Sequence, residues 1–251
     1  MKKNVLLLGA SGNIAPYIAA DLARHYELRL ADIAPFPGAM PSLTVDVTTY
    51  EQVLDAARGM DAILNLTVIR TDETHSFHVN VRGALNAMKA AAEHGITKVL
   101  HTGPEQVRHG RYDHDFDLDG PPHMPGTGYY FLTKHLSNEI CRTYAREHDI
   151  TTVCFLFNLL SARPTKPVTG RDFPPYMIVW EDLQHACRLA LEIESVPCIL
   201  TLFRSCMGFP SRGRLTGEKE RVNLVMFPGL RARLSEEIPS PTLEHRDRTV
   251  S

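Results

Sequence analysis

Short apolar runs alternate with helical patterns through the first two-thirds of this chain, and this alternation restricts its fold more than any other feature. The runs that predict strands are residues 4–8, 28–31, 43–47, 62–68, 98–102 and 152–157, and the patterns that predict helices are residues 14–25, 50–58, 75–94 and 128–147. Strands that alternate with helices of this length are joined by right-handed crossovers, so they run parallel and helices cover both faces of the sheet. The chain is therefore predicted to be an α/β protein with a doubly wound parallel sheet.

The regularity weakens after Phe157. Residues 161–176 contain four of the 17 prolines and read as a loop, followed by a predicted helix at 181–194 and a predicted strand at 198–203. We predict one main unit over residues 1–160, a small lobe over 161–234 that is integrated with it, and a solvated tail over 235–251.

The composition excludes several classes of protein. Hydrophobic residues make up 43% and charged residues 22%, which is typical of a globular protein and not of a disordered, fibrous or membrane chain. The formal net charge of −2 predicts no nucleic-acid partner and no membrane surface. The apolar run at 5–8 is too short for a signal peptide. Five cysteines without a C-x-x-C pair favour a reducing compartment, so the predicted location is the cytoplasm.

The first predicted strand runs directly into a glycine turn at residues 9–15, and a helix follows. Gly9 permits the tight turn, Gly12 lets the backbone approach a pyrophosphate, and the helix N-terminus offers free N–H groups to the anion. The pattern predicts a dinucleotide site whose turn residues are Gly9, Ser11, Gly12, Asn13 and Ile14.

Acidic and small residues follow the next strands of the predicted sheet. Asp32 closes the second strand, 20 residues after Gly12, where a carboxylate can accept both ribose hydroxyls. Asp32 alone could be an ordinary turn residue, and so could Asp46 after the third strand. Acids at the ends of successive strands together favour a cofactor. The remaining predicted contacts are Asp46, Val47, Leu66 and Thr67. A 2′-phosphate would meet the Asp32 carboxylate without a cationic partner, so NAD is favoured over NADP.

Tyr130 and Lys134 lie one turn apart on one face of the predicted helix 128–147. A free tyrosine, with a pKa near 10, is a poor base at neutral pH. A nearby ammonium and an oxidised nicotinamide favour the phenolate, which can then accept a proton. The alternative is a surface tyrosine beside a solvated lysine.

Together these motifs resemble the short-chain dehydrogenase/reductase superfamily, in its extended NAD-dependent epimerase/dehydratase group. The resemblance covers residues 3–200 and rests on the glycine turn, Asp32, Asp46-Val47, the run Asn80-Val81-Arg82-Gly83-Ala84-Leu85-Asn86, Tyr130-x-x-x-Lys134 and Trp180-Glu181-Asp182-Leu183. Within the group the chain is most similar to uronate dehydrogenases, which oxidise the anomeric hydroxyl of a hexuronic acid to a lactone with NAD.

The resemblance implies a Rossmann-like fold in which residues 1–160 form the NAD-binding core with its catalytic helix, and 161–234 form a substrate-side lobe. It further implies that Tyr130 is the acid/base, that Lys134 lowers its pKa and holds the nicotinamide ribose, and that Asn86 is a structural support. Relatives often pair as homodimers through the helices that correspond to residues 75–94 and 128–147.

The chain departs from the family pattern at two positions. Pro104 aligns with the serine that holds the reacting oxygen, so Thr102 is the predicted substitute, and Glu105 or His101 could also reach the substrate. Leu156 stands where many relatives carry an arginine. Arg163 and Arg171 remain for an anionic substrate, and Arg171 is the better candidate for a bidentate carboxylate clamp. Glu105 and Arg171 are the predicted substrate contacts.

The histidines are scattered, and the acidic stretch 109–119 lacks the glycine and the terminal glutamate of a calcium loop, so no metal is predicted. The favoured function is an NAD-dependent oxidoreductase that takes hydride from a hydroxyl of a small, polar, sugar-like substrate. One alternative is a sugar epimerase or dehydratase of the same family. The other is a dinucleotide-binding sensor that has lost catalysis, as the Gly103-Pro104 pair would allow.

Overall fold

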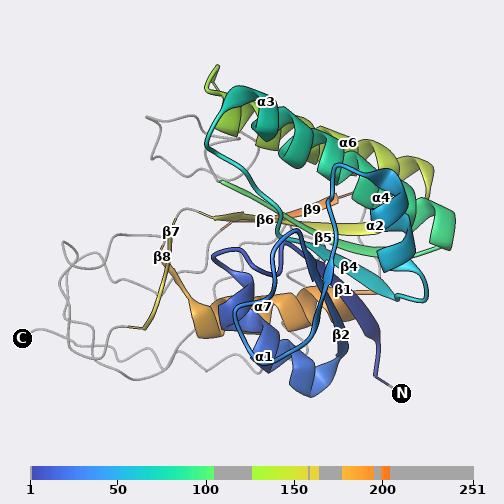
Figure 1. Ribbon diagram of the computed structural model, residues 1–251, viewed down its shortest axis with the longest axis vertical. Coiled ribbons are helices and arrows are strands. Elements are labelled where there is room, and N and C mark those ends of the chain that lie inside the picture. Colours follow the sequence, from blue (N-terminus) through green and yellow to red (C-terminus); the bar gives the residue numbers. More distant parts are fainter. Residues whose placement is uncertain (1, 105–125, 158, 164–176, 195–198, 204–251) are drawn as a thin grey trace, which may run out of the picture.

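The computed structural model describes residues 2–104, 126–157, 159–163, 177–194 and 199–203. Within these ranges, seven parallel strands form one sheet in the order β3-β2-β1-β4-β5-β6-β9 (Figure 1). The strands are β1 (Asn4–Leu8), β2 (Glu27–Asp32), β3 (Ser42–Thr44), β4 (Ala62–Asn65), β5 (Lys98–Pro104), β6 (Thr151–Phe157) and β9 (Ile199–Phe203). The predicted doubly wound, Rossmann-like parallel sheet is confirmed.

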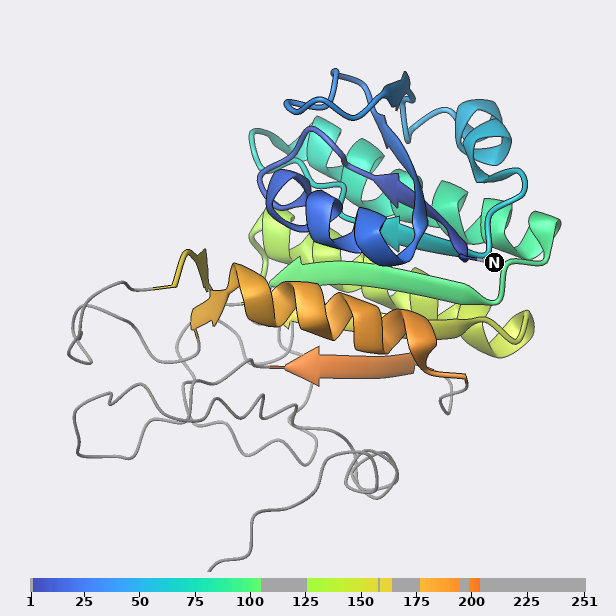
Figure 2. The same ribbon diagram turned by 90° about the horizontal axis from the view of Figure 1, so that it is seen from below.

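Helices cover both faces of this sheet, as Figure 2 shows from below. One face carries α1 (Ala15–His25) and α7 (Trp180–Glu192), which pack against each other. The other face carries α2 (Tyr50–Ala57), α4 (Gly83–His94) and α6 (Tyr129–Glu147). A strand between two helical layers has no solvent side, and this explains why β1 reads as an unbroken apolar run instead of an alternating one.

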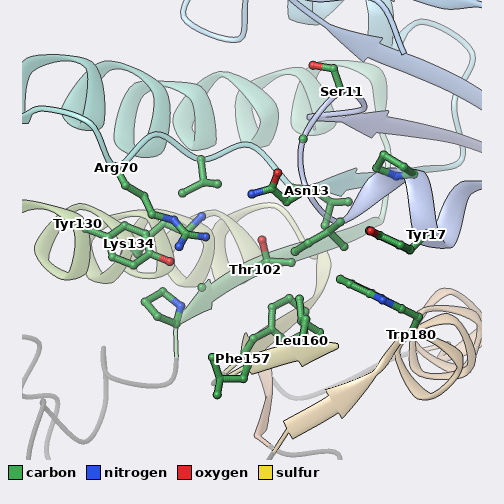
Figure 3. A pocket seen from close by; sticks show the side chains of 18 of the residues that line it. Ser11, Asn13, Tyr17, Arg70, Thr102, Tyr130, Lys134, Phe157, Leu160 and Trp180 are labelled. Atoms are coloured by element: carbon green, nitrogen blue, oxygen red, sulfur yellow. The ribbon is translucent and has the colours of Figure 1, made fainter. Parts of the chain in front are cut away.

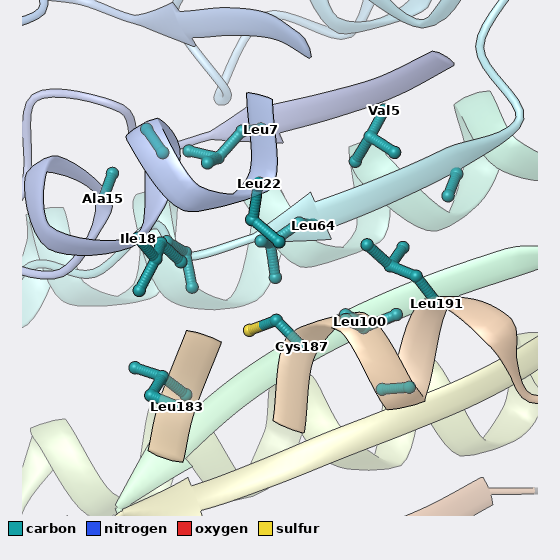
Figure 4. Packing of buried hydrophobic residues seen from close by; sticks show 14 of the residues in the cluster. Val5, Leu7, Ala15, Ile18, Leu22, Leu64, Leu100, Leu183, Cys187 and Leu191 are labelled. Carbon is teal, nitrogen blue, oxygen red and sulfur yellow. The ribbon is translucent and has the colours of Figure 1, made fainter. Parts of the chain in front are cut away.

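Side chains of β1 alternate between two hydrophobic cores. Val5 and Leu7 pack with α1 and α7, whereas Leu6 and Leu8 pack with α2, α4 and α6. Figure 4 shows the first core, where Leu22 of α1 and Cys187 of α7 meet over the sheet. Burial on both faces fixes the register of β1, because a slip by one residue would exchange the two sets of side chains.

The chain order reverses beside β1, since β2 pairs with one of its edges and β4 with the other. Such a switch point opens a crevice at the carboxyl ends of the strands, which is where open α/β sheets bind their ligands. The carboxyl ends of β1, β4 and β5 therefore position the site.

The prediction of a single helix over 75–94 is wrong in its details. The segment begins earlier, as α3 (Glu73–Ser76), passes through a π-helical segment η1 (Phe77–Arg82) and continues as α4. Asp72 caps the start by accepting a hydrogen bond from the backbone N–H of His75. The sequence pattern missed both features because a cap lies outside the apolar periodicity and a π turn disturbs it only locally.

Two predicted strands are shorter in the structure, and one small sheet was not predicted. β4 ends at Asn65, not at residue 68, because the Asn65 side chain accepts the N–H of Thr67 and turns the backbone away. β3 ends at Thr44 instead of residue 47. The strands β7 (Leu159–Ser161) and β8 (Met177–Val179) pair in parallel, and three residues are too few to give a periodic signal. Most of the predicted 161–234 lobe and the 235–251 tail lie outside the described residues, so both stay predictions.

Candidate active site

Two cavities lie along the carboxyl ends of the strands. The larger, of about 770 Å³, contains Tyr130 and Lys134, and the smaller, of about 550 Å³, contains Asp32 and Asp46. The residues that line both of them are Ser11, Gly12, Asn13, Ile14, Leu66, Val68 and Arg70. Because they share this wall, the two cavities form one cleft with the glycine turn at its middle.

The glycine turn has the geometry that a phosphate cradle needs. Gly9 has φ 86°, and a Cβ there would lie 2.8 Å from the carbonyl carbon of Leu66, so any side chain would displace backbone. The N–H of Gly12 donates to the carbonyl oxygen of Gly9 at 3.2 Å and closes the turn. No side chain caps the N-terminus of α1 at Ile14. Pro16 has no N–H and the N–H of Tyr17 donates to the carbonyl oxygen of Ile14 at 3.1 Å, so the N–H of Ala15 is the helical group left to an anion. These residues fit a dinucleotide pyrophosphate.

Asp32 faces the smaller cavity at the end of β2, as predicted from its spacing. Its Oδ2 accepts the N–H of Ser11 at 2.9 Å, which joins the carboxylate to the glycine turn. Asp46 and Val47 line the same cavity, although the Asp46 carboxylate also accepts the N–H of Thr48 at 2.9 Å. Asp46 therefore serves the turn after β3 and can contribute to the cavity at the same time.

Lys134 is a fully buried side chain on α6 and lies at the inner wall of the larger cavity (Figure 3). Its Nζ donates to the carbonyl oxygen of Thr67 at 3.4 Å. Burial lowers the pKa of Lys134 to about 8, because the low-dielectric interior disfavours the ammonium. The lysine thus links α6 to the segment that follows β4.

Tyr130 lies one turn before Lys134 and also lines the larger cavity. Burial raises the pKa of its phenol, and the positive charge of Arg70 opposes that rise. The guanidinium carbon of Arg70 lies 5.0 Å from the centroid of the Tyr130 ring, a cation–π distance. Arg70 was not among the predicted site residues. Its only sequence signal was its place just after the fourth strand.

Thr102 is buried near the end of β5 and lines the larger cavity together with Gly103 and Pro104. Its hydroxyl donates to the carbonyl oxygen of Asn65 at 3.4 Å, so an oxygen lone pair remains to accept a bond. Leu156 is buried in β6 opposite Gly103, where an apolar side chain packs against the neighbouring strand.

His101 is buried in β5 and links this strand to α6. The hydroxyl of Ser137 donates to the carbonyl oxygen of Lys134 at 2.8 Å, so it accepts from His101 Nε2 at 2.9 Å. His101 Nδ1 then accepts from the amide of Asn65 at 3.4 Å. Burial and the Lys134 charge hold the pKa of His101 well below its usual value, so the ring is neutral and positions its neighbours.

Asn80 and Asn86 both act as structural supports around the cleft. The Asn80 amide bonds both the N–H and the carbonyl of Ile69 at 2.9 Å, and it donates to the Thr133 hydroxyl at 2.9 Å. Asn86 donates to the carbonyl oxygen of Val47 at 2.8 Å. The motif that contains them was recognised in the sequence, but the contacts of Asn80 depend on the π-helical segment and were not predicted.

Glu105, Arg171 and the acidic stretch 109–119 lie outside the described residues, so their predicted roles stay predictions. Arg163 lies 3.9 Å from the carboxylates of both Glu181 and Asp182, at the start of α7.

Comparison with known proteins establishes the family. Residues 5–179 match the model of the NAD dependent epimerase/dehydratase family, and the chain belongs to that family. A 3-beta-hydroxysteroid dehydrogenase from Mycolicibacterium neoaurum is 34% identical over 43% of this chain and 34% of its own length. This chain thus matches only about a third of that relative. An NAD-dependent glucose-6-phosphate dehydrogenase from Haloferax volcanii is 27% identical over 66% of this chain and 72% of its own length.

Solved structures give the same fold. A mutant uronate dehydrogenase from Agrobacterium tumefaciens, complexed with NAD, has a TM-score of 0.69 at 21% identity, with 80% of this chain and 77% of that chain covered. The family match confirms the predicted class, an NAD-dependent enzyme of the short-chain dehydrogenase/reductase type, and NAD as its cofactor. Among the described helices, none has the length and apolar character that crossing a membrane requires.

Proposed function

We propose that this protein oxidises a hydroxyl of a small, polar, sugar-like substrate and passes the hydride to NAD, in the manner of a uronate dehydrogenase. The observation that carries the proposal is the placement of Tyr130 and Lys134 in one cavity that continues into the dinucleotide cradle. A proton acceptor for the hydroxyl and a hydride acceptor for its carbon can therefore act on the same carbinol group.

The chain's own residues perform the proton transfer. When bound, NAD supplies the acceptor for the hydride that leaves the carbinol carbon as its C–H bond breaks. The Tyr130 phenolate accepts the hydroxyl proton, and the carbon–oxygen bond becomes a carbonyl. Arg70 provides positive charge that favours the phenolate over the phenol, against the opposing effect of burial. The proposed role of Lys134, one helical turn away, is to add to that charge.

The remaining residues hold the reactants. The glycine turn and the N-terminus of α1 would hold the pyrophosphate, and Asp32 would accept the ribose hydroxyls. Thr102 supports the reacting oxygen. It takes the role that a serine has in the family pattern, at the position where this chain has Pro104. Two of the proteins compared above, the uronate dehydrogenase and the glucose-6-phosphate dehydrogenase, support a polar hydroxyl compound as the substrate.

Absorbance of NADH at 340 nm tests this proposal with a panel of hexuronic acids, hexose 6-phosphates and hexoses. The wild-type protein should produce NADH with at least one of them. The Tyr130→Phe variant should lose roughly 100- to 10,000-fold in kcat, which is the usual contribution of proton transfer. It should bind NAD as the wild type does. Normal turnover by Tyr130→Phe would refute the assignment.

A second candidate function is a dinucleotide-binding sensor without turnover, and Pro104 is the observation that favours it. A proline ring lines the larger cavity and offers no hydroxyl to a substrate. This candidate predicts that the protein binds NAD tightly and produces no NADH with any member of the panel.

A further inference from the structure

The segment between β4 and α3 brings a guanidinium into the larger cavity. Figure 3 shows the Arg70 side chain extending toward Tyr130. Arg70 lines both cavities, and its guanidinium carbon lies 5.0 Å from the centroid of the Tyr130 ring. It is thus the cation that stands beside the proposed proton acceptor.

The backbone at this point is held by side chains from three other positions. The amide of Asn80 bonds both backbone groups of Ile69 at 2.9 Å, and the hydroxyl of Ser76 donates to the Ile69 carbonyl at 3.1 Å. The Tyr129 hydroxyl donates to the carbonyl oxygen of Arg70 at 2.9 Å. These hydrogen bonds fix the backbone of Ile69 and Arg70, so the fold sets the position from which the Arg70 side chain extends.

The described lining of the larger cavity is positively charged. Among the described residues that line the larger cavity, Arg70 and Lys134 are the charged ones, and both are cations. No carboxylate in the described part of the chain lies within ion-pair distance of Arg70. The apolar part of the lining consists largely of Phe131, Phe157, Leu159, Leu160 and Trp180. A guanidinium in such a cavity favours an anion, which it can bind with two parallel hydrogen bonds.

We propose that Arg70 binds an anionic group of the substrate, a carboxylate or a phosphate, and thereby selects the charged form of the sugar-like compound. This inference rests on the proposed function and deepens it by naming the residue that determines specificity. It assigns to Arg70 the role that the sequence had suggested for Arg171. The anion and the reacting hydroxyl then belong to one small molecule that lies between Arg70 and the nicotinamide end of the cleft.

Arg70→Met and Arg70→Lys test the proposal. Methionine keeps much of the apolar stem, whereas lysine keeps the charge but cannot form the paired hydrogen bonds. Arg58→Met is the matched control, since Arg58 is an exposed arginine that pairs with Asp55 away from the cleft. Each variant, loaded with NAD, is assayed with hexuronates, hexose 6-phosphates and the corresponding neutral hexoses. Calorimetry measures binding of the same compounds, so the anchor is tested without turnover.

The wild type should prefer one charged class over its neutral counterpart by about 100-fold in kcat/KM, which is within the range of a charged hydrogen bond pair. A preference for the hexuronates identifies a carboxylate, and a preference for the hexose phosphates identifies a phosphate. Arg70→Met should lose this preference through a higher KM for the charged class, with NAD affinity unchanged. Its kcat should fall for charged and neutral substrates alike, because the cation that lowers the Tyr130 pKa is also gone. The preference of Arg70→Lys should fall between those of the wild type and Arg70→Met, and Arg58→Met should keep the preference of the wild type.

Three outcomes would overturn the proposal that Arg70 anchors the anion. The first is that wild type and Arg70→Met discriminate equally between charged and neutral substrates. The second is that the NAD-loaded wild type binds no anionic compound, and the third is that Arg70→Met changes only the affinity for NAD. Oxidation of neutral hexoses independently of Arg70 would overturn the anchor and keep the proposed function. Anion binding that depends on Arg70, without any NADH formed, would keep the anchor and overturn the proposed function.

Discussion

The Nζ of Lys134 lies 3.4 Å from the carbonyl oxygen of Thr67, and this long contact is the hydrogen bond that the structure gives to a fully buried ammonium. A buried charge with so little compensation destabilises the fold. Lys134 therefore costs stability, which is expected where a site needs a cation inside the protein.

We predict that Lys134→Met makes the protein more stable at pH 7 while it abolishes turnover. The folded pKa of about 8 lies below the ordinary value of 10.5, so at pH 7 the buried ammonium costs roughly 3 kcal/mol. Denaturant unfolding measures the difference between variant and wild type.

The sign of the pH effect follows from the same shift. Between pH 8 and 10.5 the unfolded wild type binds more protons than the folded protein, so its stability rises with pH in this window. The advantage of Lys134→Met should therefore shrink as the pH rises. An advantage that stays constant across this window would contradict the assignment.

Gly9→Ala should destabilise the protein far more than Gly59→Ala does. Both glycines have positive φ, but a Cβ at Gly9 would meet backbone at 2.8 Å, whereas nothing lies within 4 Å of one at Gly59. Gly59→Ala should cost about 1 kcal/mol from backbone strain alone, and Gly9→Ala about 2 kcal/mol or more beyond that. Similar unfolding free energies for the two variants would mean that the turn is not constrained in this way.

Asp32→Ala should weaken NAD binding by about tenfold or more, because charged hydrogen bonds contribute about 1.5–3 kcal/mol. It should also reduce discrimination against NADP, since the carboxylate that would repel a 2′-phosphate is gone. Asp55→Ala, which removes an exposed carboxylate on α2, is the control. Titration of each variant with NAD and NADP measures both effects, and a wild type that binds NADP more tightly than NAD would refute the argument.

Thr102→Val should lower kcat by about 100-fold with little change in NAD affinity, which is the typical effect of removing one group that holds the reacting oxygen. The substitution preserves the shape of the side chain. Thr143→Val, on the outer surface of α6, is the control because its hydroxyl serves only the carbonyl of Glu139 among its described contacts. Unchanged turnover by Thr102→Val would show that another group holds the oxygen.

Much of this fold could be predicted from the sequence because it is encoded locally. The continuous apolar run of β1 indicates a strand covered on both faces, and the spacing from Gly12 to Asp32 reflects one strand–helix–strand unit. Tyr130 and Lys134 were predicted for the same reason, since four residues make one helical turn. The predicted homodimer through the α4 and α6 regions stays a prediction.

Arg70 and Asn80 could not be predicted as a pair, because their relationship depends on the third dimension. Arg70 belongs to an irregular segment whose path is set by hydrogen bonds from Asn80, and Asn80 reaches it from a π-helical segment. Neither feature has a period that the sequence displays. His101 was noted as a candidate near the site, and its neutral, bridging role became clear only from its contacts with Ser137 and Asn65.

Direct hydride transfer is the central claim, and a deuterium-transfer experiment tests it most directly. A panel substrate that carries deuterium on the carbinol carbon is incubated with the wild-type protein and NAD, and the NADH is analysed by mass spectrometry. The account predicts that NADH accumulates with one deuterium from the substrate, and that Tyr130→Phe forms little or none. Oxidised substrate together with NADH that lacks this deuterium would contradict the account, as would an epimerised product with no net NADH.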